Sequence, residues 1–254
     1  LPPGLRAVSA LGLACCLALL SACGGSGDTA SNAQTASPAS GGSPNASADP
    51  ETDTLAPPPP VPKLACADLS GKTIAAADIG LPSGGATITE ATAVAAGAAG
   101  NLYGDYCKVR GTIAPVNPAS PVINFALNLP ANWNRKTIHF GGGGFNGTLI
   151  DGTEPIRFGP AGKPAPLALG YATYGSDSGH QSSSITDARF AADEESLANY
   201  GGQALKKTRD VAQQLVRLFY GEQPAHAYFL GTSTGGRDGL AYIQRWPLDY
   251  DGLI

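Results

Sequence analysis

A serine between two glycines is the residue whose surroundings most clearly suggest chemistry. Residues 231–235 read Gly-Thr-Ser-Thr-Gly, which places Ser233 at the centre of a G-x-S-x-G pattern. The pattern alone is weak because Gly and Ser are common in this chain. Its position strengthens it, since an apolar predicted strand (residues 227–230) precedes the serine and a predicted helix (237–245) follows. This order is typical of a nucleophile elbow, in which a sharp turn exposes a serine hydroxyl above a sheet edge.

A second segment could hold the negative charge that an attacking serine creates. A predicted strand (136–140) runs into four glycines, the last of which is Gly144, and the glycine loop (residues 141–147) ends in Phe-Asn-Gly. Such a loop offers free N–H groups, and the helix after Ser233 offers the N–H of Thr234. Phosphate binding fits less well, because no Lys-Ser/Thr follows the glycines. The glycine loop and the serine turn together favour acyl transfer. The alternative for the serine segment is a Gly/Ser-rich turn without chemistry.

Hydrophobic periodicity predicts the elements that must position these segments. Residues 122–129 alternate at period two, which predicts a strand, and residues 203–220 have helical spacing and stop at Gly221. Shorter strands are expected at 72–74, 86–96, 106–113, 136–140, 171–174 and 227–230. The back half alternates strands and helices, which favours an α/β fold with a mostly parallel sheet and flanking helices. The front half has more antiparallel character.

Composition limits the possible functions. The chain has 254 residues, 43% of them hydrophobic, which allows one large domain or two small ones. Only 14% are charged, with 16 basic against 20 acidic side chains and a net charge of −4. This balance provides no basic stripe, so nucleic acid is excluded as a partner.

The first residues predict export and a lipid anchor. Residues 1–22 have the apolar core of a signal peptide and end in Leu-Ser-Ala before Cys23, which resembles a bacterial lipobox. We expect cleavage before Cys23, acylation of its sulfur, and a periplasmic or outer-membrane lipoprotein. The alternative is ordinary secretion with cleavage near Ala22. Residues 23–63 are low in large apolar residues and predict a disordered tether, so the folded domain is expected at 64–254.

Two of the five cysteines lie in the predicted folded domain. Cys66 and Cys107 form an even pair in an exported protein, which predicts a disulfide. The alternative is two buried free thiols.

Together these segments resemble the tannase and feruloyl esterase family of α/β-hydrolases, which includes mono-hydroxyethyl terephthalate hydrolases. The likeness runs from about Cys66 to Ile254. It rests on the two domain cysteines, the glycine loop, and the segments 129–134, 174–180, 228–237 and 245–252. The resemblance implies that Ser233 is the nucleophile, that the N–H groups of Gly144 and Thr234 form the oxyanion hole, and that Cys66 and Cys107 are bonded. It also implies a small aromatic ester as substrate: feruloyl, galloyl or terephthaloyl.

The chain departs from this family in two ways. Thr232 stands where the family usually has a cysteine bonded to another beside the catalytic histidine, so one link in the active site is missing. The family's lid domain, calcium site, catalytic Asp and catalytic His all come later than Ile254. We therefore expect an incomplete hydrolase domain, with no cofactor in this chain and negligible esterase turnover by the chain alone.

The upstream histidines do not replace the missing base. His139 and His226 are expected to be structural, and His180 is expected to be structural or to line the substrate site. The carboxylates after the serine, Asp238, Asp249 and Asp251, lie too near it in sequence to serve as the acid. Two other functions stay open: a non-catalytic, surface-tethered binding lipoprotein with a hydrolase-like fold, and an acyltransferase.

Overall fold

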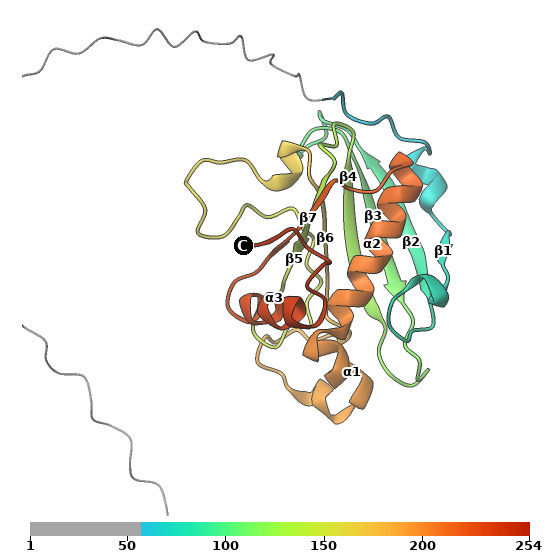
Figure 1. Ribbon diagram of the computed structural model, residues 1–254, viewed down its shortest axis with the longest axis vertical. Helices are drawn as coiled ribbons and strands as arrows, with labels where there is room; N and C mark the ends of the chain where they lie inside the picture. Colours follow the sequence, from blue (N-terminus) through green and yellow to red (C-terminus); the bar gives the residue numbers. More distant parts are fainter. Residues whose placement is uncertain (1–56) are drawn as a thin grey trace, which may run out of the picture. The chain divides into compact units, whose positions relative to one another are not determined.

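A computed structural model describes residues 57–254, which form a mixed sheet with helices against it (Figure 1). The sheet has eight strands in the order β1-β2-β3-β4-β6-β5-β7-β8. The predicted signal peptide, the lipidation site Cys23 and most of the tether lie outside the described residues. The Arg135 side chain donates to the carbonyl of Pro57 (3.3 Å) and the main-chain N–H of Lys63 donates to the carbonyl of Phe219 (2.6 Å), so the end of the predicted tether already contacts the folded domain.

The front half of the sheet is an antiparallel meander. Its strands are β1 (Thr73–Ile74), β2 (Ala86–Val94), β3 (Tyr106–Ile113) and β4 (Ile123–Pro130). Consecutive strands pair antiparallel, and β4 also pairs antiparallel with β6. These bounds lie within two residues of those predicted from the alternating pattern.

The back half of the sheet is parallel, as predicted. Its strands are β5 (Lys136–Phe140), β6 (Ala172–Ser176), β7 (His226–Leu230) and β8 (Gly252–Leu253). β5 lies between β6 and β7, and β8 follows β7. Because the strands run in one direction, the loops after β5 and β7 emerge at the same edge. Those loops carry the glycines and the serine.

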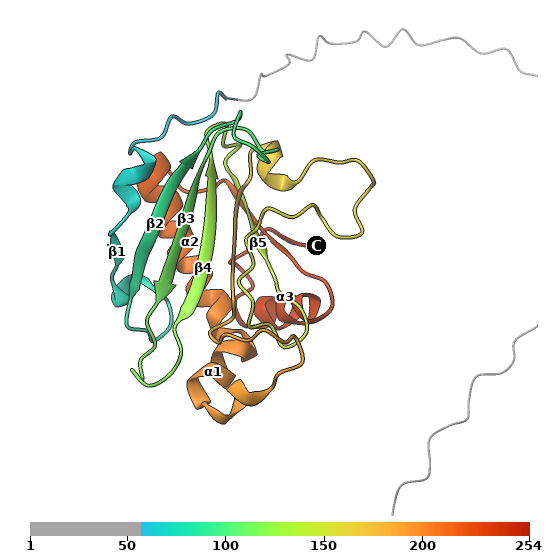
Figure 2. The same cartoon turned by 180° about the vertical axis from the view of Figure 1, so that it is seen from behind.

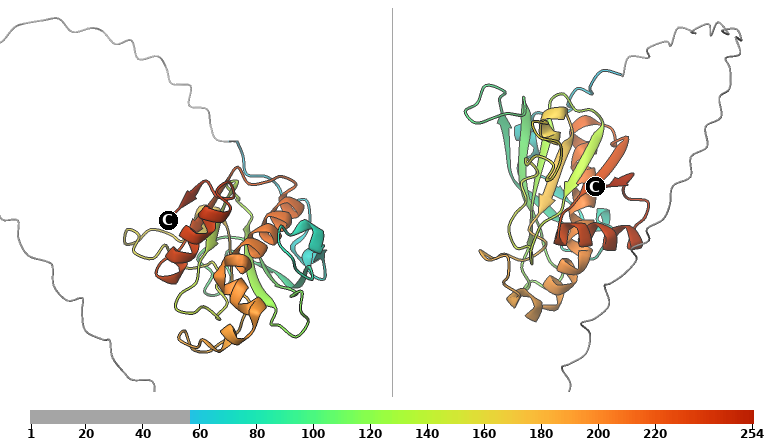
Figure 3. Two further views of the ribbon diagram at one scale, coloured as in Figure 1. Left: turned by 60° about the horizontal axis from the view of Figure 1, so that its bottom comes forward. Right: turned by 90° about the vertical axis from the view of Figure 1, so that its left-hand side faces the viewer.

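Helices α2 (Ala204–Tyr220) and α3 (Thr234–Arg245) lie on the same face of the sheet (Figures 1 and 3). α2 ends at Gly221, whose φ of 81° is left-handed, as its glycine predicts. The shorter α1 (Glu194–Ala198) is followed by a short π-helix at Asn199–Gln203, with a kink at Gly202. The other face of β2 to β4 has no helix of the described residues across it (Figure 2). No helix in that part of the chain is both long and apolar enough to cross a bilayer.

The core separates into three clusters. The largest packs α2 against the front strands, and includes Phe125, Leu127 and Val216. A second joins α2, β7 and α3 through Leu205, Phe229 and Tyr242. A third lies on the opposite face of β5 and β7, where the loop after β5 covers it; its members are Ile138, Phe140, Leu230, Ile150, Ile156, Tyr171 and Tyr228. The strands that carry the glycine loop and the serine are therefore packed on both faces.

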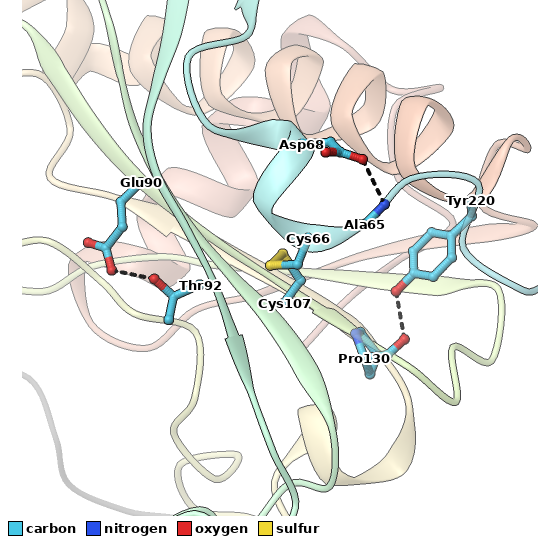
Figure 4. The surroundings of a disulfide bond; sticks show 8 residues. All are labelled: Ala65, Cys66, Asp68, Glu90, Thr92, Cys107, Pro130 and Tyr220. Carbon is cyan, nitrogen blue, oxygen red and sulfur yellow. Dashed lines mark hydrogen bonds between the residues drawn. A yellow bond between two sulfur atoms is a disulfide. The ribbon is translucent and has the colours of Figure 1, made fainter.

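A disulfide fixes the start of the domain to β3 (Figure 4). Cys66 begins a 3-10 helix (Cys66–Leu69), and its sulfur is bonded to that of Cys107, with 5.5 Å between the Cα atoms. The disulfide prediction is confirmed, and the alternative of free thiols is wrong. Nearby, the Tyr220 hydroxyl donates to the carbonyl of Pro130 (2.7 Å), which ties the end of α2 to β4.

Candidate active site

Ser233 lies on a sharp turn between β7 and α3. Its φ of 56° and ψ of −123° lie in a region that a residue with a side chain rarely adopts, so the backbone is strained there. A Cβ on Gly231 would collide with the backbone of Gly235, so the turn closes only with a glycine at that position. The predicted strand, turn and helix order is confirmed, and Ser233 is exposed.

The glycine loop begins beside this turn. The N–H of Gly141 donates to the carbonyl of Leu230 (2.8 Å), which extends the β5–β7 pairing to the end of β7. A Cβ on Gly235 would stand 2.8 Å from the Gly142 carbonyl oxygen, so the loop and the first turn of α3 approach within backbone contact. Gly144 has a φ of +58°, and a Cβ there would collide with the carbonyl of Ile185. At Gly144 and Gly235 neighbouring backbone leaves no room for a side chain, whereas at Gly142 it is the Asn146 side chain that does so.

The loop and the serine share one cavity of about 580 Å³. The cavity is lined by backbone and side chains from the ends of β5 and β7, from the glycine loop, and from two further loops. Its lining residues are Phe140, Gly141, Gly142, Gly143, Gly144, Asn146, Thr148, Ile150, Glu154, Pro155, Arg157, Ile185, Leu230, Gly231, Thr232 and Ser233. A volume of this size suits one small organic ligand.

Two backbone donors beside the serine are free. Within residues 57–254 neither the N–H of Gly144 nor that of Thr234 donates to a protein acceptor. Thr234 is the first residue of α3, where the helix dipole favours negative charge. The Thr234 side chain also contacts the loop directly, because its hydroxyl donates to the Gly144 carbonyl (2.6 Å). The structure thus brings Gly144 of the glycine loop together with Ser233 and Thr234, which come from a separate segment of the sequence.

His139 is a core residue. Its side chain is fully buried, its Nδ1 lies 2.7 Å from the Tyr250 hydroxyl, and its ring stacks on Tyr174 at 4.5 Å. Burial, aided by the charge of Arg209, lowers the pKa of His139 to about 3, so the ring is neutral at pH 7. Its packing fits the structural role expected of it.

The other two histidines do not contact the serine either. The His180 ring is buried and stacks on Phe190 at 3.9 Å; burial lowers its pKa, and nearby backbone carbonyls partly offset this. His226 stands at the far end of β7, half exposed and 3.7 Å from Asp251. No histidine of the described residues hydrogen-bonds with Ser233.

The carboxylates after the serine have structural partners. Asp238 is buried and accepts hydrogen bonds from the Arg237 side chain (2.5 and 3.1 Å). Asp249 accepts from the Tyr242 hydroxyl, and Asp251 accepts from the N–H of Ala227. All three carboxylates therefore make structural hydrogen bonds to residues of α3 or β7. In the described part of the chain no three His, Cys, Asp or Glu side chains gather closely enough to hold a metal ion.

Sequence reasoning missed the loops that complete the cavity. Ile185 comes from a Ser/Thr-rich segment, and residues 148–157 carry no periodic pattern, so neither gives a sequence signal. Asn146 was part of the glycine loop, yet its buried side chain and its contact with Asp238 (3.5 Å) follow only from the fold.

Comparisons with known proteins show the family to which the chain belongs. The family described as "Tannase and feruloyl esterase" matches residues 107–254. An uncharacterized esterase of Agrobacterium fabrum is 44% identical over 189 residues, which are 74% of this chain and 34% of that protein. A mono(2-hydroxyethyl) terephthalate hydrolase of Piscinibacter sakaiensis is 30% identical over 159 residues, 59% of this chain and 26% of that protein.

The fold is shared with a solved structure. Feruloyl esterase B from Aspergillus oryzae superposes with a TM-score of 0.56 and 22% identity over 74% of this chain, which is 36% of that chain. The predicted α/β-hydrolase fold is confirmed. The chain spans about a third or less of the length of these relatives.

Proposed function

Because the chain belongs to the tannase and feruloyl esterase family, we propose that the full-length protein is a serine carboxylic ester hydrolase acting on aromatic acid esters. One observation carries the proposal: Ser233, on a strained turn, shares a cavity with the glycine loop and lies beside two free backbone N–H groups. This is the arrangement that acyl transfer through a serine requires.

In the proposed mechanism the Ser233 hydroxyl attacks the ester carbonyl. The carbonyl oxygen becomes negatively charged, and the N–H groups of Gly144 and Thr234 donate to it. A fixed donor of this kind stabilises the transition state by about 3–4 kcal/mol. The proton of the Ser233 hydroxyl passes through the base to the alcohol oxygen as the ester C–O bond breaks, and water then attacks the acyl-serine, which releases the acid and restores the serine hydroxyl. Both donors are backbone groups held by the fold, so little reorganisation is needed as charge develops.

The general base and its acid are proposed to come from residues outside this chain. In α/β-hydrolases the order is Ser, then acid, then His. His139, His180 and His226 all precede Ser233 and each has other surroundings. A serine hydroxyl without a base is a weak nucleophile at neutral pH, so the chain alone is expected to have negligible turnover.

The aromatic acyl group is proposed to occupy the apolar part of the cavity. Phe140, Ile150, Ile185 and Leu230 contribute apolar side chains there, and a planar ring is bound well by such surfaces. The relatives' names include feruloyl and terephthalate esters, which supports the aromatic class and not one member of it.

The location of the protein remains a proposal from its sequence. We propose that the protein is an exported lipoprotein held at a membrane through acyl chains on Cys23. The tether would let the folded domain extend away from the membrane surface. The calcium that the family resemblance implies is proposed to bind in the lid domain, outside residues 57–254.

The test compares hydrolysis of p-nitrophenyl acetate, methyl ferulate and a terephthalate monoester by the full-length protein, its Ser233→Ala variant and the present chain. We expect the full-length protein to prefer the aromatic esters and Ser233→Ala to lose at least about 10³-fold in kcat. Unchanged hydrolysis by Ser233→Ala would contradict the proposal. A folded full-length protein that hydrolyses no ester would favour the non-catalytic binding lipoprotein.

A further inference from the structure

The carbonyl of Gly144 is held by a side chain from the other half of the site. The Thr234 hydroxyl donates to this oxygen at 2.6 Å, across 90 residues of sequence. Thr234 also supplies one of the two free N–H groups, and Gly144 supplies the other. Thr234 therefore supplies one donor from its own backbone, and its side chain holds the carbonyl of the residue that supplies the other.

The peptide groups on both sides of Gly144 are fixed by hydrogen bonds. Before it, the Gly143 carbonyl accepts from the N–H of Asn146 (2.9 Å). After it, the Gly144 carbonyl accepts from Thr234, and the N–H of Phe145 donates to the Ile185 carbonyl (2.7 Å). With both flanking planes held, the N–H of Gly144 keeps one direction although glycine is the most flexible residue.

Of these bonds, only that of Thr234 reaches from the loop to the serine turn. The turn within residues 143–146 is local, and Ile185 lies in another loop. The bond from Asn146 to Asp238 at 3.5 Å also reaches α3, but it is long and therefore weak. The Thr234 hydroxyl is thus the short link that sets the Gly144 N–H relative to Ser233.

We infer that the Thr234 side chain is a positioning group, which holds the Gly144 peptide so that the two N–H donors act on the same oxygen. The inference rests on the proposed esterase function. It predicts that the hydroxyl matters mainly in the transition state, because the oxyanion forms only there. Loss of the hydroxyl should therefore lower kcat more than it raises KM.

The test removes the hydroxyl with little change in shape. In the full-length protein, Thr234→Val keeps the β-branched side chain and its backbone N–H, whereas Thr234→Ser keeps the hydroxyl. With p-nitrophenyl acetate we expect Thr234→Val to lose about 10- to 100-fold in kcat with KM changed less than about threefold. Thr234→Ser should recover most of the activity. Thr89→Val is the matched control, since it removes a hydrogen bond that a threonine hydroxyl on β2 donates to the Arg110 carbonyl on β3.

Hydrogen exchange gives a readout that does not depend on activity. In Thr234→Val, amides of residues 141–147 should exchange at least about fivefold faster than in the unaltered protein, and in Thr234→Ser they should not. Equal kcat for the Val variant, or equal loss in Val and Ser, would overturn the inference. If the protein has no Ser233-dependent hydrolysis, the proposed function fails by itself. The exchange comparison then decides the positioning role, and unchanged exchange in Thr234→Val would reject it.

Discussion

The front and back halves of the sheet are built by different means. The front strands are held by side chains: a large apolar cluster against α2 and the Cys66–Cys107 disulfide. At the back, the edge that carries Ser233 is built on close backbone contacts among glycines, and the backbone of the serine itself is strained. The contrast teaches that stability and chemistry are separated along the sheet. Changes at the front should alter the free energy of unfolding, whereas changes at the back edge should alter catalysis as well.

The largest expected effect is on stability at the front. Replacing both cysteines, Cys66→Ala with Cys107→Ala, frees a loop closed over a sequence separation of 41. Chain entropy predicts a loss of about 4 kcal/mol in the free energy of unfolding. Urea unfolding measures it, and in the full-length protein kcat/KM of the folded variant should stay within about twofold of the unaltered value. A stable variant with lost activity would break the separation of the halves.

A smaller loss is expected where the backbones meet at the back. In Gly231→Ala the new Cβ collides with the backbone around Gly235, which cannot yield as a side chain could. We expect a loss of about 3 kcal/mol in unfolding free energy, together with lost esterase activity. Gly143→Ala is the control, because a Cβ there meets nothing within 4 Å. Equal stability of the two variants would show that the turn is not closely packed.

The pH dependence of the free energy of unfolding should report on His139, which is buried in the core on β5. The folded pKa of His139 is about 3, below its ordinary value of 6.5, so the unfolded chain binds this proton first as pH falls. Its contribution is complete above pH 6.5 and is lost between there and pH 3. At pH 5 the protein should be less stable than at pH 7 by about 2 kcal/mol from this group.

His139→Phe isolates that contribution, because it keeps the aromatic packing against Tyr174 and removes the titrating group. The stability difference between pH 7 and pH 5, from urea unfolding at each pH, should shrink by about 2 kcal/mol in the variant. An unchanged difference would mean that His139 is not held neutral in the fold.

The smallest expected effect measures the strain at the serine itself. Ser233→Ala and Ser233→Gly both remove the hydroxyl, but only glycine adopts a φ of 56° without strain. We expect the Gly variant to be more stable than the Ala variant by about 1 kcal/mol, measured by urea unfolding. If Ala were the more stable of the two, the turn would not store strain.

The sequence predicted the two halves unequally well. The strands of the front half and helix α2 follow from periodicity, because one face of each must be apolar, and Cys66 and Cys107 were paired correctly. At the back, Ser233 and Gly144 were placed at the right edge because strand direction fixes where the loops emerge. The remaining cavity wall was not predictable, since Ile185 and residues 148–157 lie in loops without periodic pattern. Strand β8 was not predictable either, because two residues are too few to show a periodic pattern.

Covalent labelling tests the central claim most directly. A fluorophosphonate reacts with a serine only when the hydroxyl is activated and the phosphoryl oxygen is held by oxyanion donors. Treating the full-length protein and locating the adduct by peptide mass spectrometry should give one phosphonylated residue, Ser233, and no adduct in the Ser233→Ala variant. A folded full-length protein that remains unlabelled, or that is labelled at another serine, would contradict the account.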